Sequence, residues 1–274
     1  MTHDLVRVSQ QDIAYRTSRG DGRPVVFVHG NSSSSRTWTH LLDGDFGRSH
    51  RCLAFDLPGH GASPAPKAGS GVYSPAGYAA VLTGFLDALD VRDAVIVGWS
   101  LGGHILLEAA PGLPEAAGFV IFGTPPISGP ADMPEAFLPN PVLNVGFTPE
   151  PGEDDVRAYA AAQLAPGSSL PIDDLVADIL AADGAARAEL GAGIIAATFA
   201  DEVEIVATLT TPLAILHGAG DQLVNLDYIR KLSAPSLWRG GVQVIEGAGH
   251  TPQEEAPREL AGLLDQFISG LPHA

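Results

Sequence analysis

Residues 94–105 read AVIVGWSLGGHI and pass from a predicted strand through a tight turn into a predicted helix. The apolar, β-branched run Ala94–Val97 is typical of a strand buried on both faces. The turn has the pattern G-x-S-x-G, in which the serine takes a strained backbone conformation that points its hydroxyl outward. The sequence therefore predicts Ser100 as a nucleophile at a helix N-terminus, where unpaired N–H groups favour developing negative charge.

Short apolar runs of the same kind alternate with longer helical patterns along most of the chain. The expected strands are Leu5–Val8, Ile13–Tyr15, Val25–Val28, Cys52–Phe55, Ala94–Val97, Phe119–Phe122, Leu213–Leu216 and Val242–Ile245. Ser74-Pro75 is a helix start, since serine suits the N-cap and proline at the first position loses no needed donor. The alternation predicts an α/β fold with a mostly parallel central sheet flanked by helices.

The alternation breaks in the stretch that precedes the strand Leu213–Leu216. Ten of the 22 prolines fall between Pro125 and Pro171, which predicts loops and short turns there. Three alanine-rich patterns then predict short helices: Asp154–Leu164, Ile172–Ala182 and Ala185–Thr198. We expect a core domain of residues 1–123 and 212–274 that carries a mainly helical cap, residues 124–211.

Composition excludes several classes of protein. The 274 residues include 15 Lys+Arg and 32 Asp+Glu, a formal charge of −17 that disfavours nucleic acid as a partner. A single cysteine, Cys52, excludes an internal disulfide framework and a cysteine-based zinc site. No apolar run has the length of a membrane span, and residues 1–10 lack the layout of a signal peptide. We expect a cytoplasmic protein that acts on a small molecule, and the sequence leaves its oligomeric state open.

A serine nucleophile needs a base, because its free hydroxyl is barely ionised at neutral pH. Of nine histidines, His250 is the best candidate, since it follows a predicted strand on a glycine-rich loop and completes the order Ser…Asp…His along the chain. His217 is expected to pack or cap, and His29 to hold its loop by a hydrogen bond. His60 and His104 are weaker candidates for the base.

The third group must orient the imidazole and stabilise its charged form. Asp221 follows the strand Leu213–Leu216 in the segment GAGD, residues 218–221. Asp227 is an alternative, although it reads as a solvated acid in the first turn of a helix. Asp56 is a second alternative, expected to shape a loop.

An acyl-transfer site also needs donors for the oxyanion of its tetrahedral intermediate. We expect one to be the backbone N–H of Leu101, the residue after the nucleophile. The second is expected from the loop after Val25–Val28, where we choose the N–H of Asn31. The other interpretation of that loop is a simple polar turn.

These motifs together resemble the α/β-hydrolase family: HGN (29–31), DLPGHGAS (56–63), GWSLGG (98–103) and the Asp221/His250 pair. A narrower set is similar to the AidH-type N-acyl homoserine lactonases: HGNSSS (29–34), GWSLGGHI (98–105) and GTPP (123–126). The resemblance implies an α/β-hydrolase fold and a serine hydrolase that opens the lactone ring of bacterial signals without a metal or another cofactor.

The resemblance also implies substrate contacts. A cap tyrosine contacts the ligand in that group, and Tyr159 occupies the matching position, although an ordinary helix-face aromatic is the alternative. Asn31 and Trp99 are the other residues expected to contact the substrate. The chain departs from the group in its acid, where an aspartate replaces a glutamate, so the Asp221 loop must lie closer to His250.

Two other functions remain open at this point. A carboxylesterase, or a hydrolase of another small ester, lactone or carbon–carbon bond, would use the same residues, because specificity depends on the cap. A ligand-binding receptor on a hydrolase scaffold is the alternative from another class.

Overall fold

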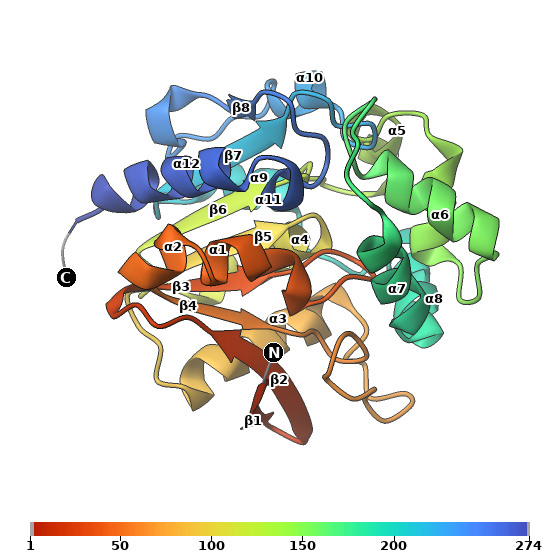
Figure 1. The fold of residues 1–274 in the computed structure, drawn as a ribbon, viewed down its shortest axis with the longest axis horizontal. Helices are drawn as coiled ribbons and strands as arrows, with labels where there is room; N and C mark the ends of the chain where they lie inside the picture. Colours follow the sequence, from red (N-terminus) through yellow and green to blue (C-terminus); the bar gives the residue numbers. More distant parts are fainter. Residues whose placement is uncertain (1–2, 273–274) are drawn as a thin grey trace.

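The computed structural model describes residues 3–272 and contains one eight-stranded sheet with the order β1-β2-β4-β3-β5-β6-β7-β8 (Figure 1). β1 and β2 are antiparallel to their neighbours, and the other strands are parallel. The strands are β1 (Asp4–Val8), β2 (Gln11–Thr17), β3 (Gly22–Val28), β4 (His50–Phe55), β5 (Val95–Trp99), β6 (Gly118–Phe122), β7 (Leu213–Gly218) and β8 (Gln243–Ile245). All the predicted strands are confirmed, with ends that shift by a few residues.

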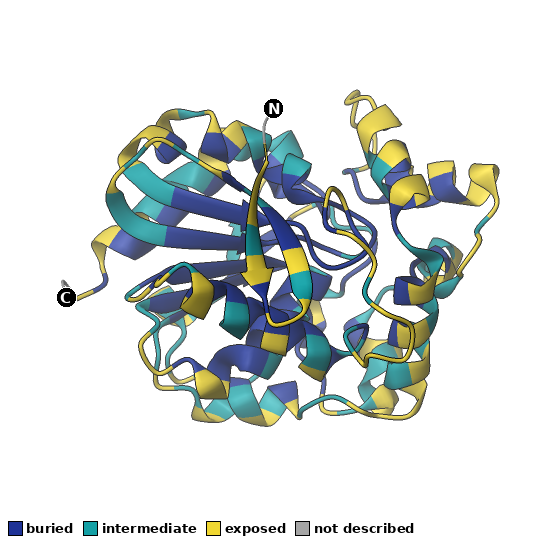
Figure 2. Cartoon of the chain, turned by 90° about the horizontal axis from the view of Figure 1, so that it is seen from below, coloured by how far each residue is buried: buried dark blue, intermediate teal, exposed yellow. Residues whose placement is uncertain are grey.

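Helices cover both faces of this sheet because the central strands are apolar on both sides. On β5, Ile96 belongs to the same buried cluster as Phe85 of α3, whereas Val95 and Val97 belong to the cluster that contains Phe267 of α12. The helices of the first face are α3 (Pro75–Ala88) and α4 (Leu101–Ala109), followed by η2 (Ala110–Gly112). Those of the second face are η1 (Ser35–Trp38), α1 (Thr39–Leu42), α2 (Asp45–Ser49), α11 (Pro252–Glu255) and α12 (Pro257–Ser269). Figure 2 shows the strands buried between these layers.

Local signals fix several of these elements. The hydroxyl of Ser74 accepts a hydrogen bond of 3.0 Å from the N–H of Gly77, as expected for the N-cap of α3. The helix predicted at the chain end is α12. The short helices η1, α1 and α2 were not predicted, because four or five residues are too few to show an apolar stripe.

Most of the segment between β6 and β7 lies beyond the carboxyl ends of the parallel strands (Figure 1). The three predicted helices are present as α6 (Glu153–Ala162), α7 (Asp173–Ala181) and α8 (Gly184–Ile195). The proline-rich part also forms short helices, which are η3 (Pro130–Asp132), α5 (Met133–Ala136) and η4 (Pro141–Phe147), and α9 (Glu202–Thr208) ends the segment. We call residues 124–211 the cap segment.

Two short helices remain between β7 and β8: α10 (Leu226–Ile229) and η5 (Trp238–Gly240). Among residues 3–272, no helix has both the length and the apolar composition needed to cross a membrane. The parallel strands β3, β5, β6 and β7 end at the same edge of the sheet, where Val28 is paired with Gly98 and Trp99 with Phe122. Side chains that directly follow these strands therefore meet under the cap segment.

Candidate active site

Ser100 lies in a strained turn between β5 and α4. Its backbone angles are φ 54° and ψ −120°, a conformation that non-glycine residues rarely adopt. A Cβ at position 98 would lie 2.4 Å from the carbonyl oxygen of Gly102, and one at position 102 would lie 2.2 Å from that of Val28. Both positions therefore require glycine. The N–H of Ser100 donates to the carbonyl of Phe122 at 2.9 Å, which helps to hold the turn.

His250 and Asp221 form a buried pair. The Nδ1 of His250 lies 2.9 Å from Oδ2 of Asp221, and their side chains are 4% and 1% exposed. Oδ1 of the same carboxylate accepts hydrogen bonds from the N–H groups of Leu223 and Val224. Burial alone would raise the pKa of Asp221, but the charge of His250 and its hydrogen bond outweigh burial and lower that pKa. The carboxylate thus fixes the proton of the imidazole on Nδ1 and leaves Nε2 as the basic nitrogen.

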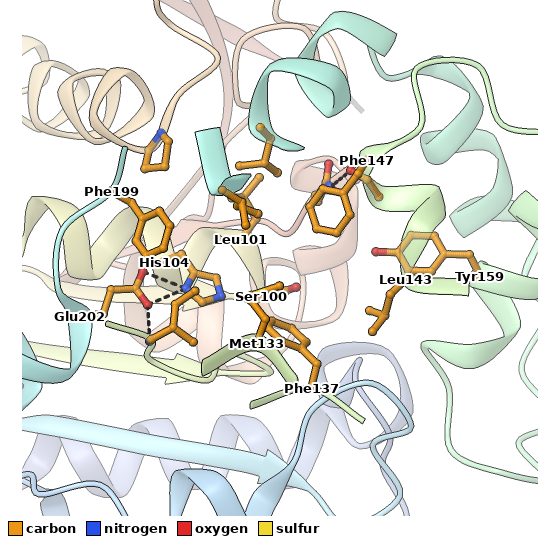
Figure 3. A pocket seen from close by; sticks show the side chains of 16 residues that line it. Ser100, Leu101, His104, Met133, Phe137, Leu143, Phe147, Tyr159, Phe199 and Glu202 are labelled. Atoms are coloured by element: carbon orange, nitrogen blue, oxygen red, sulfur yellow. Dashed lines mark hydrogen bonds and ion pairs between the residues drawn. The ribbon is translucent and has the colours of Figure 1, made fainter. Parts of the chain in front are cut away.

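Ser100 and His250 lie on either side of the turn that follows β6. A Cβ added to Gly123 would lie 2.8 Å from Cε1 of His250, and the hydroxyl of Thr124 donates to the carbonyl of Ser100 at 2.8 Å. Within residues 3–272 the hydroxyl of Ser100 makes no hydrogen bond, and it faces a pocket (Figure 3). The structure joins Asp221 to His250 directly and places Ser100 next to the same turn.

Two backbone N–H groups lie free beside the nucleophile. The loop after β3 approaches closely, since a Cβ at Gly30 would lie 3.2 Å from Cβ of Ser100. In the described part of the chain, neither the N–H of Asn31 nor that of Leu101 donates a hydrogen bond. Unpaired backbone donors near a serine are the groups that an oxyanion requires.

The side chain of Asn31 is used within the protein. Its Nδ2 donates to the carbonyl of Gly146 in the cap segment at 2.7 Å, and its Oδ1 accepts from the hydroxyl of Ser32 at 3.2 Å. Asn31 still lines the pocket. A contact between its side-chain amide and a substrate would therefore require these bonds to rearrange.

The cap segment makes further hydrogen bonds to the same loop. Arg187 of α8, which is 3% exposed, donates to the hydroxyl of Ser32 and to the carbonyls of Thr148 and Ile179. The hydroxyl of Ser34 donates to the carboxylate of Asp178 in α7 at 2.9 Å. The loop that carries the Asn31 N–H is thereby fastened to the cap segment.

The pocket has a volume of about 100 Å³ and is mostly apolar. Its polar side chains are those of Asn31, Ser100, His104, Tyr159 and Glu202. Tyr159 of α6 points its hydroxyl toward the pocket (Figure 3), and burial raises its pKa to about 12. The phenol is therefore neutral at physiological pH and available as a hydrogen-bond donor. The apolar lining residues are Pro75, Leu101, Ile127, Met133, Phe137, Leu143, Phe147, Leu190, Ile194 and Phe199.

Trp99 does not lie where a substrate contact was expected. It is 2% exposed and does not line the pocket, because it belongs to the cluster on the α12 face of the sheet. Alternate side chains of a strand point to the same face, so Trp99 lies on the same face of the sheet as Val95 and Val97. Its indole N–H instead donates to the backbone carbonyl of His250.

The alternatives to the proposed acid and base occupy other places. Asp56 accepts hydrogen bonds from the N–H groups of Ser35 and Ala62 and shapes a loop, as expected. Asp227 lies exposed in the first turn of α10. His29 is fully buried and accepts a hydrogen bond from the N–H of Leu57.

One polar pair in the pocket was not recognised from the sequence. Nδ1 of His104 lies 2.9 Å from both carboxylate oxygens of Glu202, and both residues line the pocket. His104 was considered only as a weak candidate for the base, and Glu202 follows Asp201 in a pattern that resembles an ordinary helix start.

A protein-family model described as "Alpha/beta hydrolase family" matches residues 25–263, which is most of the chain. The chain belongs to this family. Among solved structures, this alpha/beta hydrolase is similar to a variant of the N-acyl homoserine lactonase AidH complexed with N-hexanoyl homoserine lactone. The two chains are 34% identical with a TM-score of 0.92, and the match covers 98% of this chain and 97% of AidH.

Other relatives of this alpha/beta hydrolase have different activities. The esterase RhEst1 from Rhodococcus sp. ECU1013 is 25% identical, with a TM-score of 0.81 and coverage of 99% and 100%. The biotin biosynthesis bifunctional protein BioHC of Teredinibacter turnerae is 26% identical over 89% of this chain. The chain spans 44% of the length of that relative. The lactonase and esterase likenesses support a hydrolase.

Proposed function

We propose that this alpha/beta hydrolase is a metal-independent serine hydrolase that opens the lactone ring of N-acyl homoserine lactones. One observation carries the proposal: Ser100 faces a mostly apolar pocket that Asn31 and Leu101 also line, and the His250–Asp221 pair lies against the turn after β6 that also contacts Ser100. The likeness to AidH over nearly the whole chain supports the choice of substrate. Ser100, Asp221 and His250 are the proposed triad, and Asn31 and Leu101 are the proposed oxyanion donors.

In the proposed first step, Nε2 of His250 takes the proton of the Ser100 hydroxyl as Oγ attacks the lactone carbonyl carbon. The N–H groups of Asn31 and Leu101 donate hydrogen bonds to the oxyanion. The bond from the carbonyl carbon to the ring oxygen then breaks, and His250 gives its proton to that oxygen. The product of this step is an ester of Ser100 whose acyl part carries the new homoserine hydroxyl.

Hydrolysis of this ester requires space for water. The leaving alcohol stays tethered to the acyl group, so it must swing aside before water approaches the carbonyl. The hydroxyl of Tyr159 is the proposed partner that holds it there. His250 then deprotonates the water, a second oxyanion forms and collapses, and Ser100 leaves with the returned proton as N-acyl homoserine is released.

The place of the cap segment in this reaction is also a proposal. We treat residues 1–123 and 212–274 as the catalytic core and residues 124–211 as a cap that encloses the acyl chain. Most of the side chains around the pocket are apolar, which suits a neutral, lipid-like acyl chain. The proposed biological role is quorum quenching, the destruction of a bacterial signal, because N-acyl homoserine lactones are such signals. The proposed location is the cytoplasm.

A carboxylesterase is the second candidate function, because the likeness to the esterase RhEst1 also covers almost the whole chain. Mass spectrometry of N-hexanoyl homoserine lactone incubated with the protein separates the two. A lactonase adds one water to the substrate, and acidification reverses the gain. Cleavage of 4-nitrophenyl acetate with no change in the lactone would instead establish an esterase.

A further inference from the structure

The pair formed by His104 and Glu202 is a polar feature of the pocket that the proposed mechanism does not use. Glu202 is 3% exposed, and Nδ1 of His104 lies 2.9 Å from both of its carboxylate oxygens, which share that one donor. The N–H of Ile127 donates to Oε2 of Glu202 at 3.0 Å. A carboxylate buried so deeply needs each of these donors, because removing it from water is costly.

The carboxylate determines how His104 faces the pocket. Because Glu202 can only accept hydrogen bonds, Nδ1 of His104 carries the proton that lies between them. In the neutral ring, Nε2 then has a lone pair and acts as an acceptor. Nothing in the described residues hydrogen bonds to this Nε2, and His104 is partly open to the pocket.

His104 lies close to the reacting centre. It follows Ser100 by one helical turn on α4, and its own N–H donates to the Ser100 carbonyl at 3.3 Å. In Figure 3 the free nitrogen of the ring points toward Ser100, while Tyr159 approaches from the other side. The neighbours of His104 in this part of the pocket include Phe199 and Ile127, which offer no side-chain donor. We therefore expect the atoms next to the scissile carbonyl of a substrate held at Ser100 to lie within reach of this acceptor.

We propose that His104 is a specificity-determining residue whose Nε2 accepts a hydrogen bond from a donor close to the scissile carbonyl of the substrate. The inference rests on the proposed hydrolase function of Ser100. It assigns a substrate class: esters and lactones with an amide N–H or a hydroxyl on the carbon next to the scissile carbonyl. An N-acyl homoserine lactone belongs to this class, whereas a plain alkyl ester does not.

The test compares substrates that differ in one group. The lactone pair is N-hexanoyl homoserine lactone and its analogue with oxygen in place of the amide N–H. The aryl pair is the 4-nitrophenyl esters of N-acetylglycine and of O-acetylglycolic acid. Each kcat/KM for cleavage of the scissile bond is divided by that substrate's rate of alkaline hydrolysis, which removes differences in intrinsic reactivity. The ratio within a pair does not depend on how much of a preparation is folded.

Two variants change the acceptor without leaving a buried charge unpaired. In Glu202→Gln, the amide oxygen keeps the bond from Ile127 and the amide nitrogen donates to Nδ1 of His104. The ring proton then moves to Nε2, which becomes a donor. The double variant His104→Leu/Glu202→Gln removes the ring and keeps the bond to Ile127. Phe199→Leu is the matched control, since it changes an apolar residue that lines the same pocket without changing a hydrogen bond.

We expect the native protein to favour the N–H member of a pair by about ten-fold or more, the effect of one hydrogen bond to a partly buried acceptor. The ratio should fall to about one in both variants and stay at the native value in Phe199→Leu. A native ratio near one, or a native ratio kept in both variants, overturns the inference and leaves the pair a structural link between α4 and α9. If the aryl pair shows the preference and neither lactone is opened, the lactonase proposal fails and the role of His104 stands.

Discussion

The indole N–H of Trp99 donates a 2.7 Å hydrogen bond to the backbone carbonyl of His250, and the two rings lie with their centroids 5.8 Å apart. The residue before the proposed nucleophile thereby holds the loop that carries the proposed base. This bond joins two parts of the site that are 151 residues apart in the chain. We expect this bond to make Trp99 a positioning residue for His250.

Replacing Trp99 with phenylalanine tests this role. Phenylalanine keeps an aromatic ring in the core but has no donor, so the His250 loop loses one constraint. We expect kcat to fall by about ten-fold, as for the loss of about 1.4 kcal/mol, with little change in KM. Steady-state kinetics measure both constants. A raised KM at unchanged kcat would instead indicate direct contact between Trp99 and the substrate.

Replacing Ser100 with alanine should remove turnover and preserve the fold. We expect kcat to fall by at least about 1,000-fold, since the covalent route is lost and only binding and the oxyanion donors remain. The melting temperature should stay close to the native value, because the hydroxyl makes no hydrogen bond within residues 3–272. A variant that kept a tenth of the native turnover would exclude the proposed route.

Asp221 and Asp227 provide a matched pair of substitutions. Asp221→Asn removes the acceptor that fixes the proton of His250 on Nδ1, and we expect kcat to fall by roughly 1,000- to 10,000-fold. Asp227→Asn changes an exposed side chain on α10 and should leave kcat unchanged. Kinetics of both variants with one substrate decide the identity of the acid, and the reverse pattern would assign it to Asp227.

Tyr159→Phe distinguishes lactones from aryl esters. A lactone leaves a tethered alcohol that the Tyr159 hydroxyl is proposed to hold aside, whereas 4-nitrophenolate diffuses away. We expect kcat for N-hexanoyl homoserine lactone to fall by about ten-fold and kcat for 4-nitrophenyl acetate to change by less than about two-fold. Equal losses for both substrates would contradict this role and indicate that Tyr159 only packs.

Buried histidines should make the protein less stable in mild acid. Burial lowers the pKa of His60 to about 3 and also lowers the pKa values of His29 and His217. In the unfolded chain these groups take up protons below about pH 6.5, so the unfolded state binds more protons and stability falls as pH falls. We expect the free energy of unfolding to drop between pH 7.5 and pH 5.5, with about 1 kcal/mol of that drop due to His60.

Urea unfolding at these two pH values measures the effect. His60→Gln should reduce the drop by about 1 kcal/mol. A drop that is equal in the native protein and in His60→Gln would show that His60 does not contribute.

The parts of the fold that the sequence predicts are those with a local signal. The strand Ala94–Val97 is continuously apolar, and the final helix has a periodic apolar stripe. Both patterns can therefore be recognised from residues that are close together in the sequence. The pairing of His104 with Glu202 has no such signal, because it forms only when α9 folds back on α4, 98 residues away in the chain. The direction of Trp99 follows from strand alternation, which the expected substrate contact did not take into account.

The hydrogen bonds between the cap segment and the loop at Asn31 have a consequence for engineering. Arg187, Asp178 and Gly146 hold the residues that surround a proposed oxyanion donor. A chimera that receives the cap of a relative would exchange these anchors together with the walls of the pocket. Grafts intended to change acyl-chain preference would then alter the rate of the chemical step as well, unless the three anchors are transplanted with their partners in the host.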